Sequence, residues 1–341
     1  MKFDSLYIII GIFLVYLLFY KRKKLFIRLS KLKKEILNND KEKINTYLDL
    51  IRNNKDLIKA KQKYFIIYFV VIIFIIIFIL INIFGIYYEE YIYLYIVLLF
   101  LFLNISVLIS KKVFFNRKIE YIFNFNSLIM RDIIEKNDYS YFPNGNLDVF
   151  DFTEKKSIYS NISKFYSGNT IQTTWKNQII ELGDIKLWQT INSISTDDKL
   201  RKRDIVIYNG KIGIAYLNKP VSFNLFLQKE SLFKIKKNSS NCYDDNLFKG
   251  HEIKTDSINI VSTIFDVNIV ELINRFENKY DVFFELMISD NQIKCYINTN
   301  GFTCANPFSA KQEALNIIIT EKMFEDYINI VINLLNNIEK I

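Results

Sequence analysis

Two long uncharged runs constrain this chain more than any other feature of its sequence. Residues 65–84 and 91–110 contain no Asp, Glu, Lys or Arg. As a helix, each run would extend about 30 Å, the thickness of a bilayer's hydrocarbon core. Glu89 and Glu90 lie between the runs, and one ionised carboxylate at the bilayer centre costs about 2.5 kcal/mol or more. The sequence therefore predicts a transmembrane hairpin that turns in water at these glutamates; the alternative is a buried ion-coupling pair.

A third apolar run, residues 5–20, precedes a cluster of basic residues. A secretory signal peptide carries its basic cluster before the apolar run, so this segment is interpreted as an uncleaved anchor. Lys and Arg near membrane spans stay in the cytoplasm. The sequence thus predicts a multi-pass inner-membrane protein with its N-terminus outside and its C-terminal domain in the cytoplasm. The flanking basic residues are candidate contacts for anionic lipid: Lys21, Arg22, Lys23, Lys24, Lys61, Lys63, Lys111 and Lys112.

Charge distribution favours the membrane over nucleic acid as the partner. The net charge is +9, but the positive charge flanks the apolar runs, and residues 119–341 are slightly acidic. Three cysteines, an odd number, suit a reducing compartment and no disulfide framework. The predicted organisation is a transmembrane anchor (1–20), a basic cytoplasmic helical segment (21–63), a transmembrane helical hairpin (64–110) and a cytoplasmic α+β domain (111–341).

The last of these segments alternates between strand and helix patterns. Turn signals at Lys176-Asn177, Asn209-Gly210 and Asp290-Asn291 each separate apolar runs, which predicts three hairpins. Helical spacing predicts helices over 119–136, 261–280 and 311–339. Strands in groups followed by helices indicate an α+β fold with an antiparallel sheet and flanking helices. The final helix has a predicted core stripe: Ala314, Ile317, Ile318, Phe324, Tyr327, Ile328, Val331 and Leu334.

This layout, with SIYSNISKFYSGNTI at 157–171, QIIELGDIKL at 178–187 and IVIYNGKIGIAYLNKP at 205–220, resembles bacterial membrane proteins grouped as domain of unknown function 3137. In that family an aromatic-x-Gly turn joins two strands, and Tyr208 and Gly210 occupy its positions here. The block HEIKTDSINIVSTIFDVNIVELINRFENKY resembles the family's later strand and helix. The resemblance covers about residues 119–335 and implies the architecture without supplying catalytic residues.

No established catalytic or phosphate-binding motif is present, so the sequence predicts no catalytic residue, cofactor or metal site. The sole histidine, His251, is expected to be a surface or satisfied residue. Cys242 with His251, and Cys295 with Cys304, are too widely spaced for a structural zinc site. The acidic pairs at 197–198 and 244–245 are expected in solvated turns, and Trp175 and Trp188 on the sheet.

Two functions of different class follow. The first is a membrane protein whose cytoplasmic domain binds a partner protein or leaflet lipid without catalysis; its expected partners are the lipid bilayer and a protein partner or a second copy in a homo-oligomer. The second is a membrane-associated, hydrolase-like enzyme in which His251, the cysteines or the acidic pairs converge in one cleft. Transport is disfavoured because the apolar runs contain few polar residues.

Overall fold

The structure, a computed structural model, describes residues 32–87, 113, 115–147, 162–194, 200–229, 242–243, 251–298, 305 and 307–341. The chain divides into two compact units. Unit 1 comprises Met1–Lys41, Ile134–Phe302 and Ile318–Ile341, and unit 2 comprises Glu42–Ile133 and Thr303–Ile317. The described part of unit 1 is mainly a β-sheet with helices, whereas the described part of unit 2 is helical.

Helices follow one another through the N-terminal half, beginning with residues 32–39. The next elements are α2 (Lys41–Asn53), α3 (Lys55–Tyr87), α5 (Phe115–Phe125), the π-helical turn η3 (Asn126–Met130) and α6 (Arg131–Glu135). Asp40 separates the helix of residues 32–39 from α2, within the segment 21–63 that the sequence predicts to be helical. A second break at Asn54 was not predicted, although its cause is local. The Asn54 side chain accepts a hydrogen bond from the backbone N–H of Leu57 (3.0 Å) and caps α3.

Aromatic packing holds α3 against α5 within unit 2. The Tyr64 and Tyr121 rings lie 6.5 Å apart, and the Phe308 ring lies 5.7 Å from Tyr64. The Tyr121 hydroxyl donates a 2.6 Å hydrogen bond to the fully buried Glu313 carboxylate. Burial, together with the charge of Glu313, raises the pKa of Tyr121, so this hydroxyl stays protonated and remains a donor.

The predicted three-span membrane architecture is contradicted. Two of its spans, residues 5–20 and 91–110, lie outside the described residues. In the part of the chain that the structure does describe, no helix combines the length and apolar character needed to cross a membrane. The multi-pass inner-membrane localisation and its assigned sidedness are therefore not supported.

The remaining predicted span, residues 65–84, is not a separate element. It is the continuation of α3, which starts ten residues earlier in a lysine-rich stretch. Near that start, Leu57, Ala60 and Tyr64 are buried. The part of α3 that packs against protein therefore lies directly before the apolar run that the sequence assigned to lipid. Further along, α3 leaves a row of apolar side chains exposed among the described residues: Ile66, Phe69, Val70, Ile73, Ile76 and Ile77.

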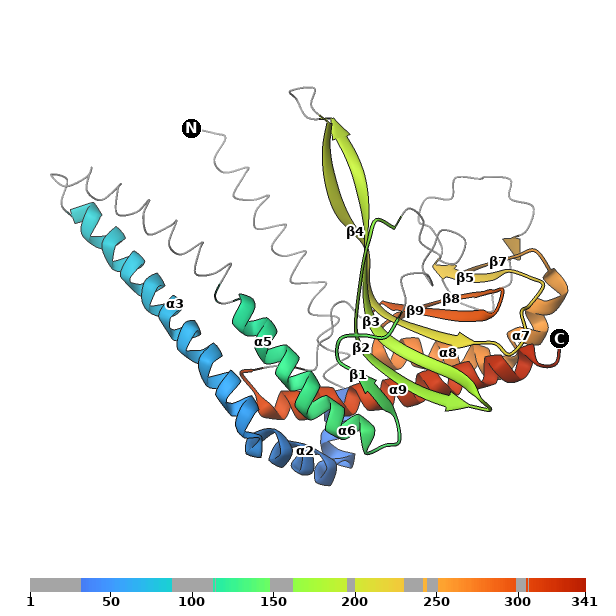
Figure 1. Cartoon of the computed structure of the whole chain (residues 1–341), viewed down its shortest axis with the longest axis horizontal. Helices are drawn as coiled ribbons and strands as arrows, with labels where there is room; N and C mark the ends of the chain where they lie inside the picture. The colour runs from blue at the N-terminus through green and yellow to red at the C-terminus, as the bar shows by residue number, and fades with distance from the viewer. Residues whose placement is uncertain are drawn as a thin grey trace. The chain divides into compact units, whose positions relative to one another are not determined.

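Unit 1 contains a single antiparallel sheet, and its fold is α+β. Over the described residues the sheet has nine strands in the order β1-β2-β3-β4-β9-β8-β5-β7-β6 (Figure 1). The strands are β1 (Ser140–Phe142), β2 (Lys164–Trp175), β3 (Gln178–Ile194), β4 (Leu200–Tyr216), β5 (Leu225–Lys229), β6 (Cys242–Tyr243), β7 (His251–Thr255), β8 (Phe283–Ser289) and β9 (Gln292–Asn298).

Two of the three predicted hairpins are confirmed. Lys176 and Asn177 join β2 to β3 with φ values of 46° and 65°, the left-handed pair that a type I′ turn requires. Asp290, with φ 50°, lies in the turn between β8 and β9. Both turns form where local turn chemistry and cross-strand pairing agree.

The hairpin predicted at Asn209-Gly210 is wrong. β4 runs straight through both residues, and Gly210 pairs with Ile185 of β3. Neither residue has a positive φ, so no type I′ turn forms. Gly210 instead allows the backbone of Ile297 to approach β4 closely, because a Cβ at this position would lie 2.5 Å from the carbonyl oxygen of Ile297.

Helices α8 and α9 pack on one face of the sheet (Figure 1). The predicted helix 261–280 is interrupted by Phe265 and Asp266. The short η6 (Ile258–Ile260) and α7 (Val261–Ile264) precede the break, and α8 (Val267–Tyr280) follows it with Asp266 as its N-cap. The last predicted helix forms α9 (Ala310–Ile338). Its predicted stripe is buried except for Ile328, which is half-buried.

The opposite face of the sheet carries its own apolar cluster. Its buried members are Leu147, Ile185, Leu187, Tyr208, Ile212, Ile214 and Tyr296. The Tyr208 and Tyr296 rings meet edge to face with centroids 5.6 Å apart. In the middle of the sheet, side chains therefore pack on both faces of β3 and β4. This packing gives the strand pair a rigid base from which its outer ends extend.

Candidate functional site

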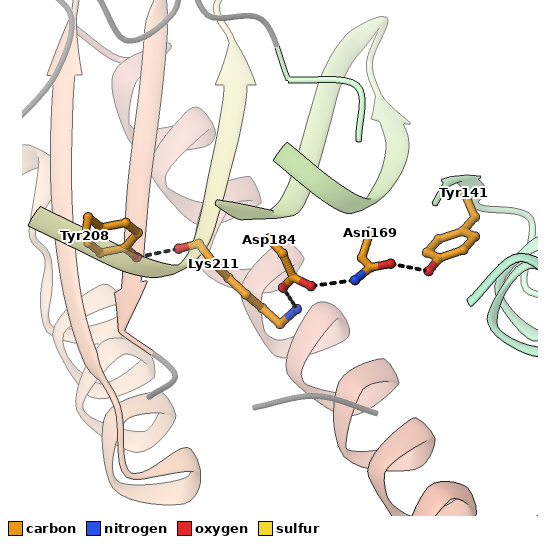
Figure 2. Close-up of polar contacts among 5 residues, drawn as sticks. All are labelled: Tyr141, Asn169, Asp184, Tyr208 and Lys211. Carbon is orange, nitrogen blue, oxygen red and sulfur yellow. Dashed lines mark hydrogen bonds and ion pairs between the residues drawn. The ribbon is translucent and has the colours of Figure 1, made fainter. Parts of the chain in front are cut away.

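A row of polar side chains crosses β4, β3 and β2 and ends at β1 (Figure 2). The Lys211 ammonium pairs with the Asp184 carboxylate, which also accepts a 2.7 Å hydrogen bond from the Asn169 amide. The Tyr141 hydroxyl donates to the Asn169 side-chain oxygen (2.9 Å), and the Tyr208 hydroxyl donates to the Lys211 carbonyl oxygen (2.7 Å). The row links four neighbouring strands by side-chain contacts in addition to their backbone ladder.

A β-bulge places Asn169 in this row. Gly168 pairs with Asp184 and Ile171 pairs with Leu182, so Asn169 and Thr170 both lie opposite Gly183. Asn169 has φ 49°, a conformation that Asn tolerates better than most residues, and its N–H donates to Pro143 (3.1 Å). The extra residue turns the Asn169 amide toward Asp184, which a regular strand would not do.

The chemistry of this row is structural. An ammonium held in an ion pair lacks the lone pair that a nucleophile needs. The Asp184 oxygens accept from Lys211 and Asn169, so the carboxylate is occupied by strand-to-strand contacts. Burial and the charge of Asp184 raise the pKa of the nearby Tyr166, which keeps that phenol protonated. The row therefore stiffens β3 and β4 close to the point where their pairing with β2 and β9 ends.

Beyond this row, β3 and β4 continue as a two-stranded ribbon, here called the arm (residues 189–194 and 200–206). Pairing of β2 with β3 ends at Lys164 and Trp188, and β9 pairs with β4 only from Lys211 onward. Among the described residues, neither outer edge of the arm has a neighbouring strand. Figure 1 shows the arm projecting from the sheet.

The surface of the arm mixes cations with apolar side chains. Lys202 and Arg203 are exposed, as are Ile191 and Val206. Asp204 is the only acidic residue in the arm's sequence. It pairs with Lys164 and accepts a 2.7 Å hydrogen bond from the Thr190 hydroxyl, and these contacts lower the pKa of Asp204. The arm therefore presents net positive charge beside exposed apolar side chains.

His251 is not the surface residue that the sequence allowed for, because its side chain is almost fully buried and makes its contacts through one ring nitrogen. Its Nε2 lies 3.1 Å from both the Glu277 carboxylate and the Phe284 carbonyl oxygen. Glu277 also accepts a 2.7 Å hydrogen bond from the Phe284 N–H, so β7, α8 and β8 meet here. Burial opposes protonation, but the hydrogen bond and charge of Glu277 outweigh it, and the pKa of His251 is raised.

This contact predicts a pH-dependent stability. A histidine whose pKa is higher in the folded chain than in the unfolded chain stabilises the fold. This stabilisation is complete below the ordinary pKa of 6.5 and is lost as the pH rises through the folded pKa. The free energy of unfolding is therefore expected to fall above about pH 6.5. Since the chain has one histidine, NMR titration of its ring reads the pKa directly. Glu277→Gln should lower that pKa, whereas Lys219→Gln should leave it unchanged; an unaltered value in Glu277→Gln contradicts the assignment.

Among the described residues, those considered for an enzyme or a zinc site are not brought together. Cys295 is a buried free thiol whose pKa is raised by burial, and it lies on β9. Cys304 and the acidic pairs at 197–198 and 244–245 lie outside the described residues. Within the described ranges, no group of His, Cys, Asp and Glu could hold a metal ion.

The predicted lipid contacts are only partly described. Lys21, Arg22, Lys23, Lys24, Lys111 and Lys112 lie outside the described residues. Lys61 is half-buried on α3, and Lys63 is exposed and pairs with Glu120 at 3.7 Å. Of the family-like turn, Tyr208 is buried and Gly210 lies inside β4, beside the polar row but not in a turn.

Sequence reasoning missed the polar row and the arm. Asp184 and Lys211 did leave a signal, since each is a charged residue inside a stretch with a strand pattern, IIELGDIKL and IVIYNGKIGIAYL. Asn169 follows a glycine in a strand, a pattern typical of a bulge. The arm was missed because the Asn209-Gly210 signal divided β4 into two short strands.

Comparison with known proteins adds one distant similarity. No family model matches the chain, and no curated protein sequence matches it. The crystal structure of the mycobacterial trehalose monomycolate transport factor A, TtfA, aligns with 57% of this chain and 92% of its own, at 7% identity and a TM-score of 0.30. A score this low supports no inference about fold or function. The resemblance to domain of unknown function 3137 stays a prediction.

Proposed function

We propose that this chain is a non-catalytic protein-binding module that binds an extended segment of a partner protein along the arm. The observation that carries the proposal is the length of β3 and β4, which outrun β2 and β9 and leave two strand edges without a neighbour among the described residues. Extended peptides commonly bind by adding a strand to such an edge.

Backbone chemistry supports strand addition here. Each unpaired edge presents N–H and C=O groups that a third strand would satisfy. A two-stranded ribbon alone is marginally stable in water, so a further strand stabilises it as well. The base of the arm is already fixed by the polar row and by packing on both faces, so ordering the arm costs less on binding.

A photo-crosslinking amino acid at Val206 tests this proposal in the full chain. Val206 is exposed on the arm, so a discrete adduct of higher mass is expected in cells. The same amino acid at Phe283, also exposed but outside the arm, is the matched control and should give no such adduct. An adduct of twice the chain's mass would assign the bound strand to a second copy.

Paired proline variants then test whether a strand edge is responsible. Successive backbone N–H groups point to opposite edges of a strand, so one of Arg203→Pro and Asp204→Pro removes a donor on the free edge. That variant should lose the Val206 adduct while keeping the melting temperature of the parent. Adducts that persist in both variants, or equal adducts at Phe283, would contradict strand addition.

A further inference from the structure

The cations of the arm lie on one of its two strands. The β3 half, residues 189–194, has no charged residue, whereas the β4 half contains Arg201, Lys202 and Arg203. Lys202 and Arg203 are exposed. Because Lys202 and Arg203 are adjacent in a strand, their side chains point to opposite faces. A strand that pairs with the outer edge of β4 therefore meets a cation on each of its faces.

Cross-strand pairing makes the affinity of the arm depend on the charge of the segment that binds to it. Side chains directly opposite one another on paired strands interact closely, and opposite charges attract while like charges repel. The one acid of the arm, Asp204, is engaged by Lys164 and Thr190 and offers little to a basic partner. Each carboxylate opposite Lys202 or Arg203 should tighten binding by about two- to fivefold.

Two other occupants fit this edge less well. In a symmetric dimer formed by two β4 edges, each subunit would present the same basic stretch to the other, so like charges would face one another. A nucleic acid would need a broader field of cations, since phosphate contacts supply most of the affinity. The arm instead places exposed Val206 and Ile191 beside its cations.

Building on the proposed strand addition, we infer that the arm selects an acidic, extended protein segment, which pairs with the outer edge of β4. Acidic residues at alternate positions of that segment contact Lys202 on one face or Arg203 on the other. Apolar residues between them pack beside Val206 or Ile191. Recognition is thus by charge pattern and extended backbone.

The test measures peptide binding to the full chain by fluorescence anisotropy. The probes are two labelled peptides of equal length, one alternating Glu and Val and the other alternating Lys and Val. The Glu peptide should bind about four- to twenty-fivefold more tightly, because attraction at one cation is replaced by repulsion in the Lys peptide. The double variant Lys202→Glu/Arg203→Glu should reverse this preference, and the matched surface variant Lys219→Glu, outside the arm, should keep it.

The outcomes separate this inference from the proposed function. If the Val206 adduct forms and depends on the free edge but the two peptides bind equally, strand addition stands and acidic selectivity is overturned. If no adduct forms and neither peptide binds, both are overturned. Tighter binding of duplex DNA than of the Glu peptide, lost in the same double variant, would assign the cations to nucleic acid and overturn the inference.

Discussion

Replacing Gly213 with alanine is expected to lower the free energy of unfolding by about 3 kcal/mol. A Cβ at this position would overlap the ring and hydroxyl of Tyr327, which is fully buried on α9. The Tyr327 hydroxyl also donates a 3.2 Å hydrogen bond to the Glu181 carbonyl oxygen, so the ring cannot move without losing that bond. Urea unfolding followed by circular dichroism measures the loss.

Gly168→Ala is the matched control in the same sheet. Its Cβ would lie 2.8 Å from the Tyr166 hydroxyl, but Tyr166 is 56% exposed and its ring can swing away. The expected loss is about 1 kcal/mol or less. Truncating the clashing ring in Gly213→Ala/Tyr327→Ala should make the two effects strongly non-additive. Equal losses for Gly213→Ala and Gly168→Ala would contradict the close packing of α9 on β4.

Asp184→Ala is expected to cost about 2–3 kcal/mol of unfolding free energy. The Lys211 side chain is only 8% exposed, so removing its partner leaves a buried ammonium without its counter-ion, and Asn169 loses an acceptor. The loss is below that of a fully buried pair because the Asp184 side chain is 29% exposed. Urea unfolding measures it, and a double-mutant cycle with Lys211→Met isolates the pair.

Asp204→Ala on the arm is the matched control for this ion pair. Asp204 also pairs with a lysine, Lys164, but that lysine side chain is 63% exposed and water screens the interaction. Its removal should change stability far less than Asp184→Ala does. If the two aspartate variants unfold at the same urea concentration, the polar row does not hold the strands together as described.

Elements with local causes could be predicted from this sequence. The hairpin at Lys176 and Asn177 follows from a polar turn pair between two apolar runs. Helix α9 follows from the helical spacing of its apolar residues. Asn209-Gly210 has a stronger turn signal, yet the strand continues because β3 pairs with it on one side and Ile297 approaches the glycine closely. Tertiary contacts overrode local preference there.

The candidate site depended on contacts that no local pattern encodes. Tyr141 and Asn169 are 28 positions apart, and Asp184 and Lys211 are 27 apart, so only the strand order brings them together. The apolar stretch of α3 shows the converse difficulty. Its composition predicted a lipid environment, while the burial of Tyr64 near the start of that stretch depends on partners at Tyr121 and Phe308.

The separation in sequence between β4 and Tyr327 has a consequence for synthesis on the ribosome. β4 emerges more than one hundred residues before the ring that covers Gly213. Because chains fold from the N-terminus as they are made, the face of the sheet on which α9 packs stays uncovered by α9 during that interval. The apolar face of the nascent sheet is therefore covered only when α9 has been synthesised. A chain that terminates before α9 should aggregate.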